Sequence, residues 1–278
     1  VAIKSMKNKL PSIVDYSYQK EYEFICKVPP NPYLISVYEI FIDGSSLKCH
    51  MVLEYMDQNI YQLMKSRKGN SFENRTIRNI LYQIIMGIDH IHNSGFFHRD
   101  IKPENILISA NPHRIQPGTI KSEYTVKLAD FGLARHVSNN STYTSYVSTR
   151  WYRSPEILLR AGVYSLPIDI WAFGTVAIEV ANLCPLFPGK NEMDQIWRLI
   201  EALGNPSINS DCGEWNLAYV LAKRSNIVIP EIQGSNISDL IRKPDNKKLA
   251  SMTKGCLCWD PELRYTAKDI LRHEYFST

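Results

Sequence analysis

The most constraining feature of this sequence is a long apolar segment, residues 168–187. The segment contains Asp169 and Glu179 and is interrupted by Pro185, so it does not suit a membrane span. Residues 167–183 are instead apolar on nearly every side of a helix, which predicts a helix that is buried all round. Such a helix needs neighbours on every face, and a chain of 278 residues is long enough to provide them.

The N-terminal part combines strand and helix patterns. Residues 1–4, 34–42 and 48–55 are strand-like, and Asp43-Gly44 predicts a hairpin turn between the last two. Residues 17–28 predict a helix that ends before Pro29-Pro30. These patterns together predict a small, sheet-rich lobe.

The remainder is predicted to be mainly helical. Ile77, Ile80, Ile84 and Ile88 recur at helical spacing, which predicts a long amphipathic helix that Gly95 ends. Further helices are predicted at residues 191–203, 247–258 and 266–275. Residues 110–123 are rich in turn-forming residues and predict a loop between two short strands.

Composition excludes several classes of function. The net charge of +4 is too small to indicate a nucleic-acid-binding protein, and no membrane span or signal peptide is visible. The six cysteines form no CxxC pair and no zinc-ligand spacing, which favours free thiols in a reducing compartment.

The residues that could carry chemistry lie in two short motifs. His-Arg-Asp ends at Asp100 and leads to Asn105, and Asp-Phe-Gly begins at Asp130. Each motif is common by itself, but together they can place three oxygen ligands around one cleft. Carboxylate and amide oxygens, completed by phosphate oxygens, are what Mg²⁺ takes as ligands.

These motifs resemble the catalytic and metal-binding loops of eukaryotic protein kinases. Residues 1–4, Val-Ala-Ile-Lys, resemble the strand with the phosphate-pairing lysine, and Ser154-Pro155-Glu156 resembles Ala-Pro-Glu, with Arg264 as the partner of Glu156. The resemblance implies an α+β, bilobal kinase fold. Residues 1–56 would form a truncated small lobe and the hinge, and residues 57–278 a helical large lobe that contains the catalytic loop, the activation segment and an insert.

The resemblance implies that the chain transfers the γ-phosphate of ATP to serine or threonine in proteins, with ATP and Mg²⁺ as cofactors. Lys4 would bind the phosphates, Asp100 would accept the proton of the substrate hydroxyl, and Lys102 would steady the transferred phosphoryl group. Asn105 and Asp130 would hold Mg²⁺.

A lysine on a long flexible stem needs an acidic partner to hold it. Helical spacing favours Glu21 as the partner of Lys4, with Glu23 as the alternative because Pro29-Pro30 leaves the register uncertain. By resemblance, adenine would contact the small-lobe strand, the hinge and the floor of the cleft, with Leu53 as gatekeeper: Ala2, Leu53, Glu54, Met56 and Leu107.

Residues 144–153 resemble the Thr-x-Tyr activation lip of CMGC-group kinases. The resemblance implies that an upstream kinase phosphorylates Thr144 and Tyr146. Cations from distant segments would recognise these phosphates: Lys20, Arg99 and Arg135 for phosphothreonine, and Arg150 and Arg153 for phosphotyrosine. Because these cations would converge only on an added anion, we expect phosphorylation to order the lip.

Residues 54–64 and 148–151, with the Thr-x-Tyr motif, resemble the male-germ-cell-associated kinase subfamily, and the loop at residues 110–123 resembles its fungal meiosis-inducing members. The resemblance implies a role in meiosis, sporulation or the cell cycle, in the nucleus or cytoplasm. It also implies a monomer that acts on Arg/Pro-containing protein sites.

The Gly-x-Gly-x-x-Gly loop that precedes the lysine in this family is not found ahead of Lys4 in this sequence. We therefore expect the chain to bind ATP poorly, or to be a fragment of a longer gene product. The alternative function is a truncated, catalytically weak kinase fold that serves as a binding module or scaffold.

Overall fold

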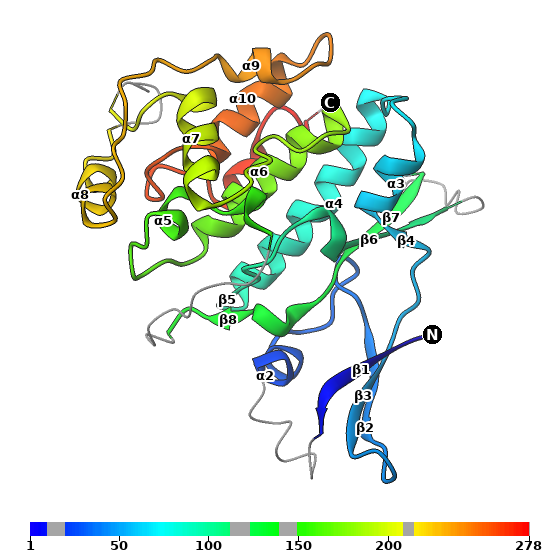
Figure 1. The fold of residues 1–278 in the computed structure, drawn as a ribbon. Coiled ribbons are helices and arrows are strands. Elements are labelled where there is room, and N and C mark those ends of the chain that lie inside the picture. The colour runs from blue at the N-terminus through cyan, green and yellow to red at the C-terminus, as the bar shows by residue number, and fades with distance from the viewer. Residues whose placement is uncertain (10–19, 112–122, 139–148, 208–213, 278) are drawn as a thin grey trace.

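Figure 1 shows the computed structural model of the chain, which describes residues 1–9, 20–111, 123–138, 149–207 and 214–277. A small region with a sheet and one helix lies at the bottom of this view, and a larger helical region lies above it. This arrangement confirms the predicted α+β fold, with a sheet-rich N-terminal region and a helical C-terminal region.

The sheet of the small region consists of β1 (Ala2–Lys9), β2 (Val37–Ile42) and β3 (Lys48–Leu53) in the order β1-β3-β2. Both pairings are antiparallel, and Met51 stands opposite both Lys4 and Ile40. Met51 and Cys49 are buried, and Ile25 of α2 (Lys20–Lys27) packs against them. The helix therefore covers the face of the sheet on which Lys4 stands.

Two predicted details of this sheet are wrong. The expected strand at residues 34–42 begins only at Val37, because Leu34 instead forms a parallel bridge with Leu128 in the large region. The strand expected at residues 48–55 ends at Leu53. The turn predicted at Asp43-Gly44 is confirmed: Asp43 accepts a hydrogen bond from the backbone of Ser46, and Leu47 takes φ 55° before β3.

The large region is built around one central helix. The helices of this region are α3 (Ile60–Ser66), α4 (Asn74–Asn93), α5 (Pro155–Leu158), α6 (Pro167–Asn182), α7 (Glu192–Leu203), α8 (Leu217–Arg224), α9 (Ile237–Leu240), α10 (Lys247–Cys256) and α11 (Ala267–Arg272). Every residue of α6 from Ile168 to Ala181 is buried, so the predicted central helix is confirmed. No helix among the described residues is both long and apolar enough to cross a bilayer.

The other long helices agree with their predicted positions, except for α11. The amphipathic helix α4 ends at Asn93, and Gly95 takes φ 78° just beyond it. Helix α11 was expected to continue to residue 275 but ends at Arg272. His273 leaves the helix in an extended conformation and residues 274–276 form a turn, and the guanidinium of Arg78 on α4 lies 5.6 Å from the centre of the Tyr275 ring.

Short strands carry the loops of the cleft. β4 (Gln58–Asn59), β6 (Ile106–Ala110) and β7 (Tyr124–Leu128) form one sheet, and β5 (Phe96–Phe97) pairs with β8 (Arg135–His136). The segment between β5 and β6 contains Asp100 and Asn105, and the segment between β7 and β8 contains Asp130. Both segments therefore face α2 and the sheet across the boundary between the two regions (Figure 1).

Candidate active site

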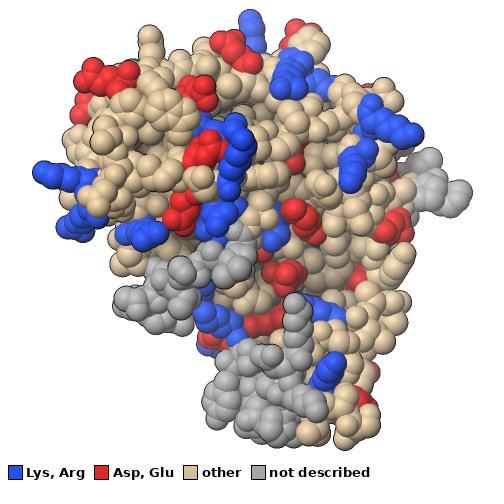
Figure 2. All heavy atoms as spheres, in the orientation of Figure 1, with Lys and Arg blue, Asp and Glu red and all other residues tan. Residues whose placement is uncertain are grey.

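A cavity of about 320 Å³ lies at the boundary between the two regions. Nine residues that the sequence singled out line it: Ala2, Lys4, Glu21, Leu53, Glu54, Met56, Asn105, Leu107 and Asp130. Ile35 and Val37 also line the cavity, and sequence reasoning missed them because the inward face of a strand depends on its register. In Figure 2, acidic and basic atoms lie close together where the small region meets the large one.

Lys4 is held between two carboxylates. Its Nζ lies 2.8 Å from Glu21 Oε1 and 2.9 Å from Asp130 Oδ1. Of the two candidate partners on α2, the structure pairs Lys4 with Glu21, which is 6% exposed, while Glu23 pairs with Lys27 on the outer surface. A charge from the sheet, one from the helix and one from the large region therefore meet at this cavity.

The charges of this group stabilise one another. Burial alone would lower the pKa of Lys4, but the Glu21 carboxylate and hydrogen bonds to Glu21 and Asp130 hold that pKa above its usual value. Burial would likewise raise the pKa of Asp130, and the hydrogen bond and charge of Lys4 outweigh it and keep that pKa low. Lys4 and Asp130 therefore both stay charged at neutral pH.

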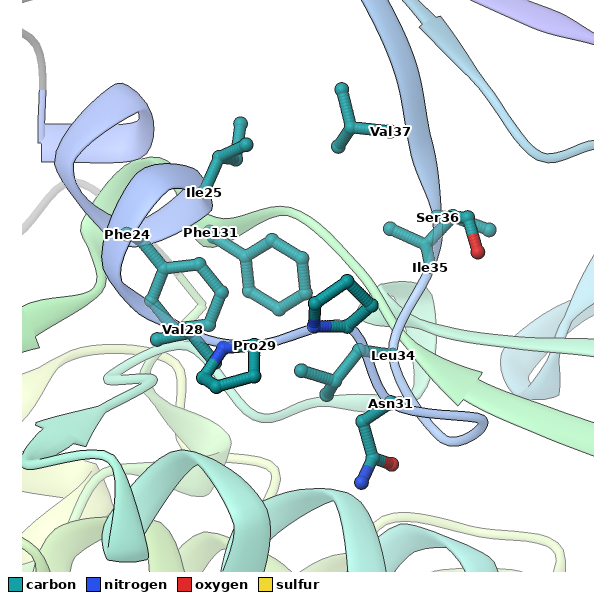
Figure 3. A pocket seen from close by; sticks show the side chains of 11 residues that line it. Phe24, Ile25, Val28, Pro29, Asn31, Leu34, Ile35, Ser36, Val37 and Phe131 are labelled. Atoms are coloured by element: carbon teal, nitrogen blue, oxygen red, sulfur yellow. The ribbon is translucent and has the colours of Figure 1, made fainter.

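An apolar contact fixes α2 relative to the segment after β7. The ring of Phe131 stacks on Phe24 with centroids 4.2 Å apart, and both rings border a second cavity of about 170 Å³ (Figure 3). Glu21 lies one helical turn before Phe24. Asp130 takes φ 63°, and this left-handed conformation turns its carboxylate toward Lys4 while Phe131 points inward.

The loop after β5 is held in place by a buried carboxylate of α6. Asp169 accepts hydrogen bonds from the backbone N–H of His98 at 2.7 Å and of Arg99 at 2.8 Å, and from the ring of His92 at 3.0 Å. Burial would raise the pKa of Asp169, but its bond to His92 and the neighbouring charges keep it low. Sequence reasoning assigned Asp169 no role in this loop, although a carboxylate in an otherwise apolar helix was the available sign of one.

Asp100, Lys102 and Asn105 meet on this loop. Lys102 Nζ lies 2.7 Å from Asp100 Oδ2, and the amide of Asn105 donates to the same oxygen at 2.8 Å. The 3-10 helix η1 (Pro103–Asn105) makes this approach possible by turning the chain back toward Asp100. Asp100 therefore has two donors fixing its carboxylate.

The donor set suits Mg²⁺ that is partly held by phosphate. Among the described residues, no group of three or more His, Cys, Asp or Glu side chains is placed to bind a metal. Asn105 and Asp130 both line the main cavity and offer an amide and a carboxylate. Mg²⁺ is commonly held by one or two such ligands together with substrate phosphates and water, so these two residues fit it.

Three of the predicted phosphate-recognising cations come together. Lys20 begins α2, Arg99 follows His98, and Arg135 begins β8. Arg135 pairs with Phe97, two residues before Arg99, and β8 contacts α2, so the three cations lie at one place. Burial lowers the pKa of Lys20, and the charges of Arg99 and Arg135 lower it further. Thr144 and Tyr146 lie outside the described residues. Arg150 begins the 3-10 helix η3 (Arg150–Tyr152) and is exposed, and Arg153 directly follows this helix and is buried.

The segment after η3 is tied to the C-terminal part of the chain. Arg264 donates to both carboxylate oxygens of Glu156, at 2.7 and 2.8 Å, and its guanidinium lies 5.2 Å from the centre of the Trp171 ring. This bidentate pair is fully buried, which makes it a strong anchor. The expected pairing of Glu156 with Arg264 is confirmed.

The protein kinase domain model matches residues 1–276. The meiosis induction protein kinase IME2/SME1 of Saccharomyces cerevisiae is 45% identical over 99% of this chain and 45% of its own length. The sporulation protein kinase mde3 of Schizosaccharomyces pombe is 44% identical over 96% of the chain and 48% of its own length, and the human serine/threonine-protein kinase MAK is 41% identical over 99% and 41%.

The chain thus spans less than half the length of these relatives. The similarity extends from the strand with Lys4 to the segment beyond Arg264, so it covers every part of the site described above. The predicted resemblance to CMGC-group kinases of the meiosis-inducing type is confirmed by these matches. The chain belongs to the protein kinase family.

Proposed function

We propose that the chain is the catalytic domain of an ATP-dependent serine/threonine protein kinase. The observation that carries this proposal is the position of Lys4, which joins Glu21 and Asp130 at a cavity that Asn105 also lines. Phosphoryl transfer needs fixed positive charge for the phosphates and oxygen ligands for a metal ion. All of these groups are present at one cleft.

Each residue would have a separate task in the transfer. Asp100, oriented by Lys102 and Asn105, would accept the proton of the attacking serine or threonine hydroxyl. Lys4 would hold the phosphates in line with that hydroxyl, and Asn105 and Asp130 would hold Mg²⁺. When bound, Mg²⁺ neutralises charge that develops on the phosphate oxygens.

Two further carboxylates support a preference for basic protein sites. Glu104 lies in the loop with Asp100, and its Oε2 is buried with no hydrogen-bond partner among the described residues. Burial raises the pKa of Glu179 to about 7, with a further contribution from the Glu104 charge, while the hydroxyl of Tyr152 donates to it at 2.9 Å. An arginine of a substrate would relieve the repulsion between these carboxylates.

The cluster formed by Lys20, Arg99 and Arg135 supports a phosphorylation switch in the lip. The charges of Arg99 and Arg135, after burial, lower the pKa of Lys20, and an added dianion would offset the repulsion among the three, so a phosphate on Thr144 would draw the lip onto them. We also propose a role in meiosis or sporulation, because relatives of the chain carry these terms in their names.

Asp130→Asn tests the catalytic proposal. Labelled-phosphate transfer from ATP to an Arg/Pro-containing Ser/Thr peptide should fall at least about 100-fold in the full-length protein, because both the metal ligand and the partner of Lys4 are lost. The matched control is Asp239→Asn, which alters an exposed aspartate of α9. Transfer that persists in Asp130→Asn would contradict the assigned metal role.

Thr144→Ala tests the switch. We expect the activity of protein treated with its activating kinase to drop severalfold or more, because the cation cluster would have no phosphate to bind. The matched control is Thr266→Ser, which keeps the hydroxyl that caps α11. An unchanged rate in Thr144→Ala would show that the lip is not the switch.

A further inference from the structure

The side chain of Arg99 is held by a residue with no assigned role. Its Nη2 donates to the hydroxyl of Tyr164 at 2.7 Å, and its Nη1 donates to the carbonyl of Leu133 at 3.3 Å. The guanidinium carbon lies 5.5 Å from the centre of the Tyr164 ring, and the edge of that ring meets Phe97. Tyr164 therefore contacts Arg99 through both its hydroxyl and its ring.

The segment from Tyr164 to Asp169 holds Arg99 by both its side chain and its backbone. Tyr164 lies between α5 and α6, and Asp169 in the first turn of α6 accepts the backbone N–H of Arg99. Arg99 takes φ 73°, a left-handed conformation that is uncommon for a residue with a side chain. Such a conformation persists only where the surroundings determine it from several sides.

The chemistry of the Tyr164 contact matters for the charge of the cluster. A carboxylate at this position would bind Arg99 equally well, but it would neutralise the guanidinium. A hydroxyl accepts the hydrogen bond and leaves the positive charge intact. Burial, followed by the charges of Arg99 and Arg135, lowers the pKa of Lys20, so Lys20 is exposed to the positive charge that Tyr164 leaves on Arg99.

We propose that Tyr164 is a positioning residue that aims Arg99 at a phosphate monoester dianion while leaving the Arg99 charge unquenched. The inference rests on the proposed lip switch and deepens it. On this view the orientation of the Arg99 side chain is set by a hydroxyl outside the lip, so the site for the phosphate is formed before the phosphate arrives. Pre-organisation of this kind lowers the cost of binding because fewer side chains must be ordered.

Inorganic phosphate tests the inference without requiring catalysis. The full-length protein, treated with phosphatase, is titrated with phosphate against chloride at equal ionic strength, and the melting temperature is followed. We expect Tyr164→Phe, which retains the ring, to raise the half-saturating phosphate concentration about three- to tenfold, the size of one typical hydrogen bond. Tyr38→Phe on the exposed side of β2 is the matched control, and Lys20→Met should also weaken the response.

A second variant separates the orientation of the Arg99 side chain from its charge. Tyr164→Glu keeps a hydrogen-bond acceptor beside Arg99 but neutralises it, so we expect the phosphate response to be lost. A response in Tyr164→Glu equal to that of wild type would overturn the part of the inference that concerns charge. Equal half-saturation in Tyr164→Phe and wild type would overturn the inference as a whole.

The two proposals fail in different ways. A wild-type protein whose melting temperature does not respond to phosphate overturns the anion switch and, with it, the role of Tyr164. If Tyr164→Phe does not melt cooperatively, wild-type protein still provides a test by ¹⁵N NMR of Arg99. Two distinct Nη signals before phosphate is added are expected, because one nitrogen bonds Tyr164 and the other Leu133. A single averaged signal would overturn the inference.

Discussion

The carboxylates of this protein differ in role because of their surroundings, and α2 shows this most clearly. Glu21 and Glu23 lie on the same helix, yet Glu21 faces Lys4 and Glu23 forms an exposed pair with Lys27. An exposed pair of this spacing contributes about 0.3–0.5 kcal/mol at most. The Lys4–Glu21 pair is part-buried, so removing Lys4 would leave the Glu21 charge uncompensated at a site that is 6% exposed, which is more costly.

Glu179 predicts a pH dependence of stability. Burial, opposed in part by the Tyr152 hydrogen bond and reinforced by the Glu104 charge, raises its pKa from 4.5 to about 7. The folded state binds the Glu179 proton more tightly than the unfolded state does. The stabilisation from this proton is therefore fully present below pH 4.5 and is lost as the pH rises through about 7. Glu179→Gln should therefore gain stability relative to wild type, by up to about 3 kcal/mol, between about pH 5 and about pH 8.

Urea unfolding of both proteins at these two pH values measures the difference. Glu231→Gln, at an exposed position, is the control and should show no comparable change with pH. A Glu179→Gln variant whose stability relative to wild type does not change with pH would show that Glu179 is ionised throughout.

At the scale of elements, the site depends on how closely α6 approaches its neighbours. Helix α6 supplies Asp169 to the catalytic loop at its N-terminal end and packs against α10 further along. A Cβ placed on Gly174 would meet Cys256 Cβ at 2.7 Å and Leu257 side-chain atoms at 3.1 Å. The missing side chain is therefore what allows the two helices to lie this close.

Gly174→Ala should push α6 and α10 apart and destabilise the protein by about 1–3 kcal/mol, the usual cost of overpacking a filled core. Thermal or urea unfolding measures this loss. Gly44→Ala is the matched control, because a Cβ at that exposed turn meets nothing within 4 Å and its φ is not positive. Equal stability of the two variants would contradict the close approach of the helices.

At the scale of the whole molecule, a few polar contacts join the two regions around the cavity. Lys127 of β7 forms a 2.8 Å ion pair with Glu54, at the end of the small sheet. Nearby, the backbone of Ile35 donates to Leu128, and Leu128 donates to Tyr33. The segment before β2 is thus hydrogen-bonded to β7, and this pairing sets the distance between the walls of the cavity.

Binding of ATP with Mg²⁺ should raise the melting temperature of the full-length protein, because a ligand that binds only the folded state stabilises it by mass action. At a free concentration about 100 times the dissociation constant, the gain is about 2.7 kcal/mol. Asp130→Asn should lose the part of this shift that depends on Mg²⁺ and serves as the control. A wild-type protein with no shift would favour the scaffold function over the enzyme.

Local sequence pattern predicted the elements of this protein well where one face or all faces are apolar. The periodic isoleucines of α4 and the apolar run of α6 are examples, since burial there depends mainly on the residues themselves. Prediction failed where a segment's end contacts a distant part of the chain and does not continue its own helix or strand. Leu34 pairs with Leu128 rather than extending β2, and the C-terminal end of α11 is shortened so that Tyr275 can pack on α4.

The sequence alone determined which residue types stand in which motifs, and hence the chemistry that Lys4, Asp100, Asn105 and Asp130 can perform. Only the tertiary structure decided which carboxylate Lys4 meets, that Asp169 holds the catalytic loop, and that Tyr164 orients Arg99. The reason is physical. Motif chemistry is a property of side chains at fixed spacing, whereas these contacts join segments far apart in the chain, and only packing brings such segments within hydrogen-bonding distance.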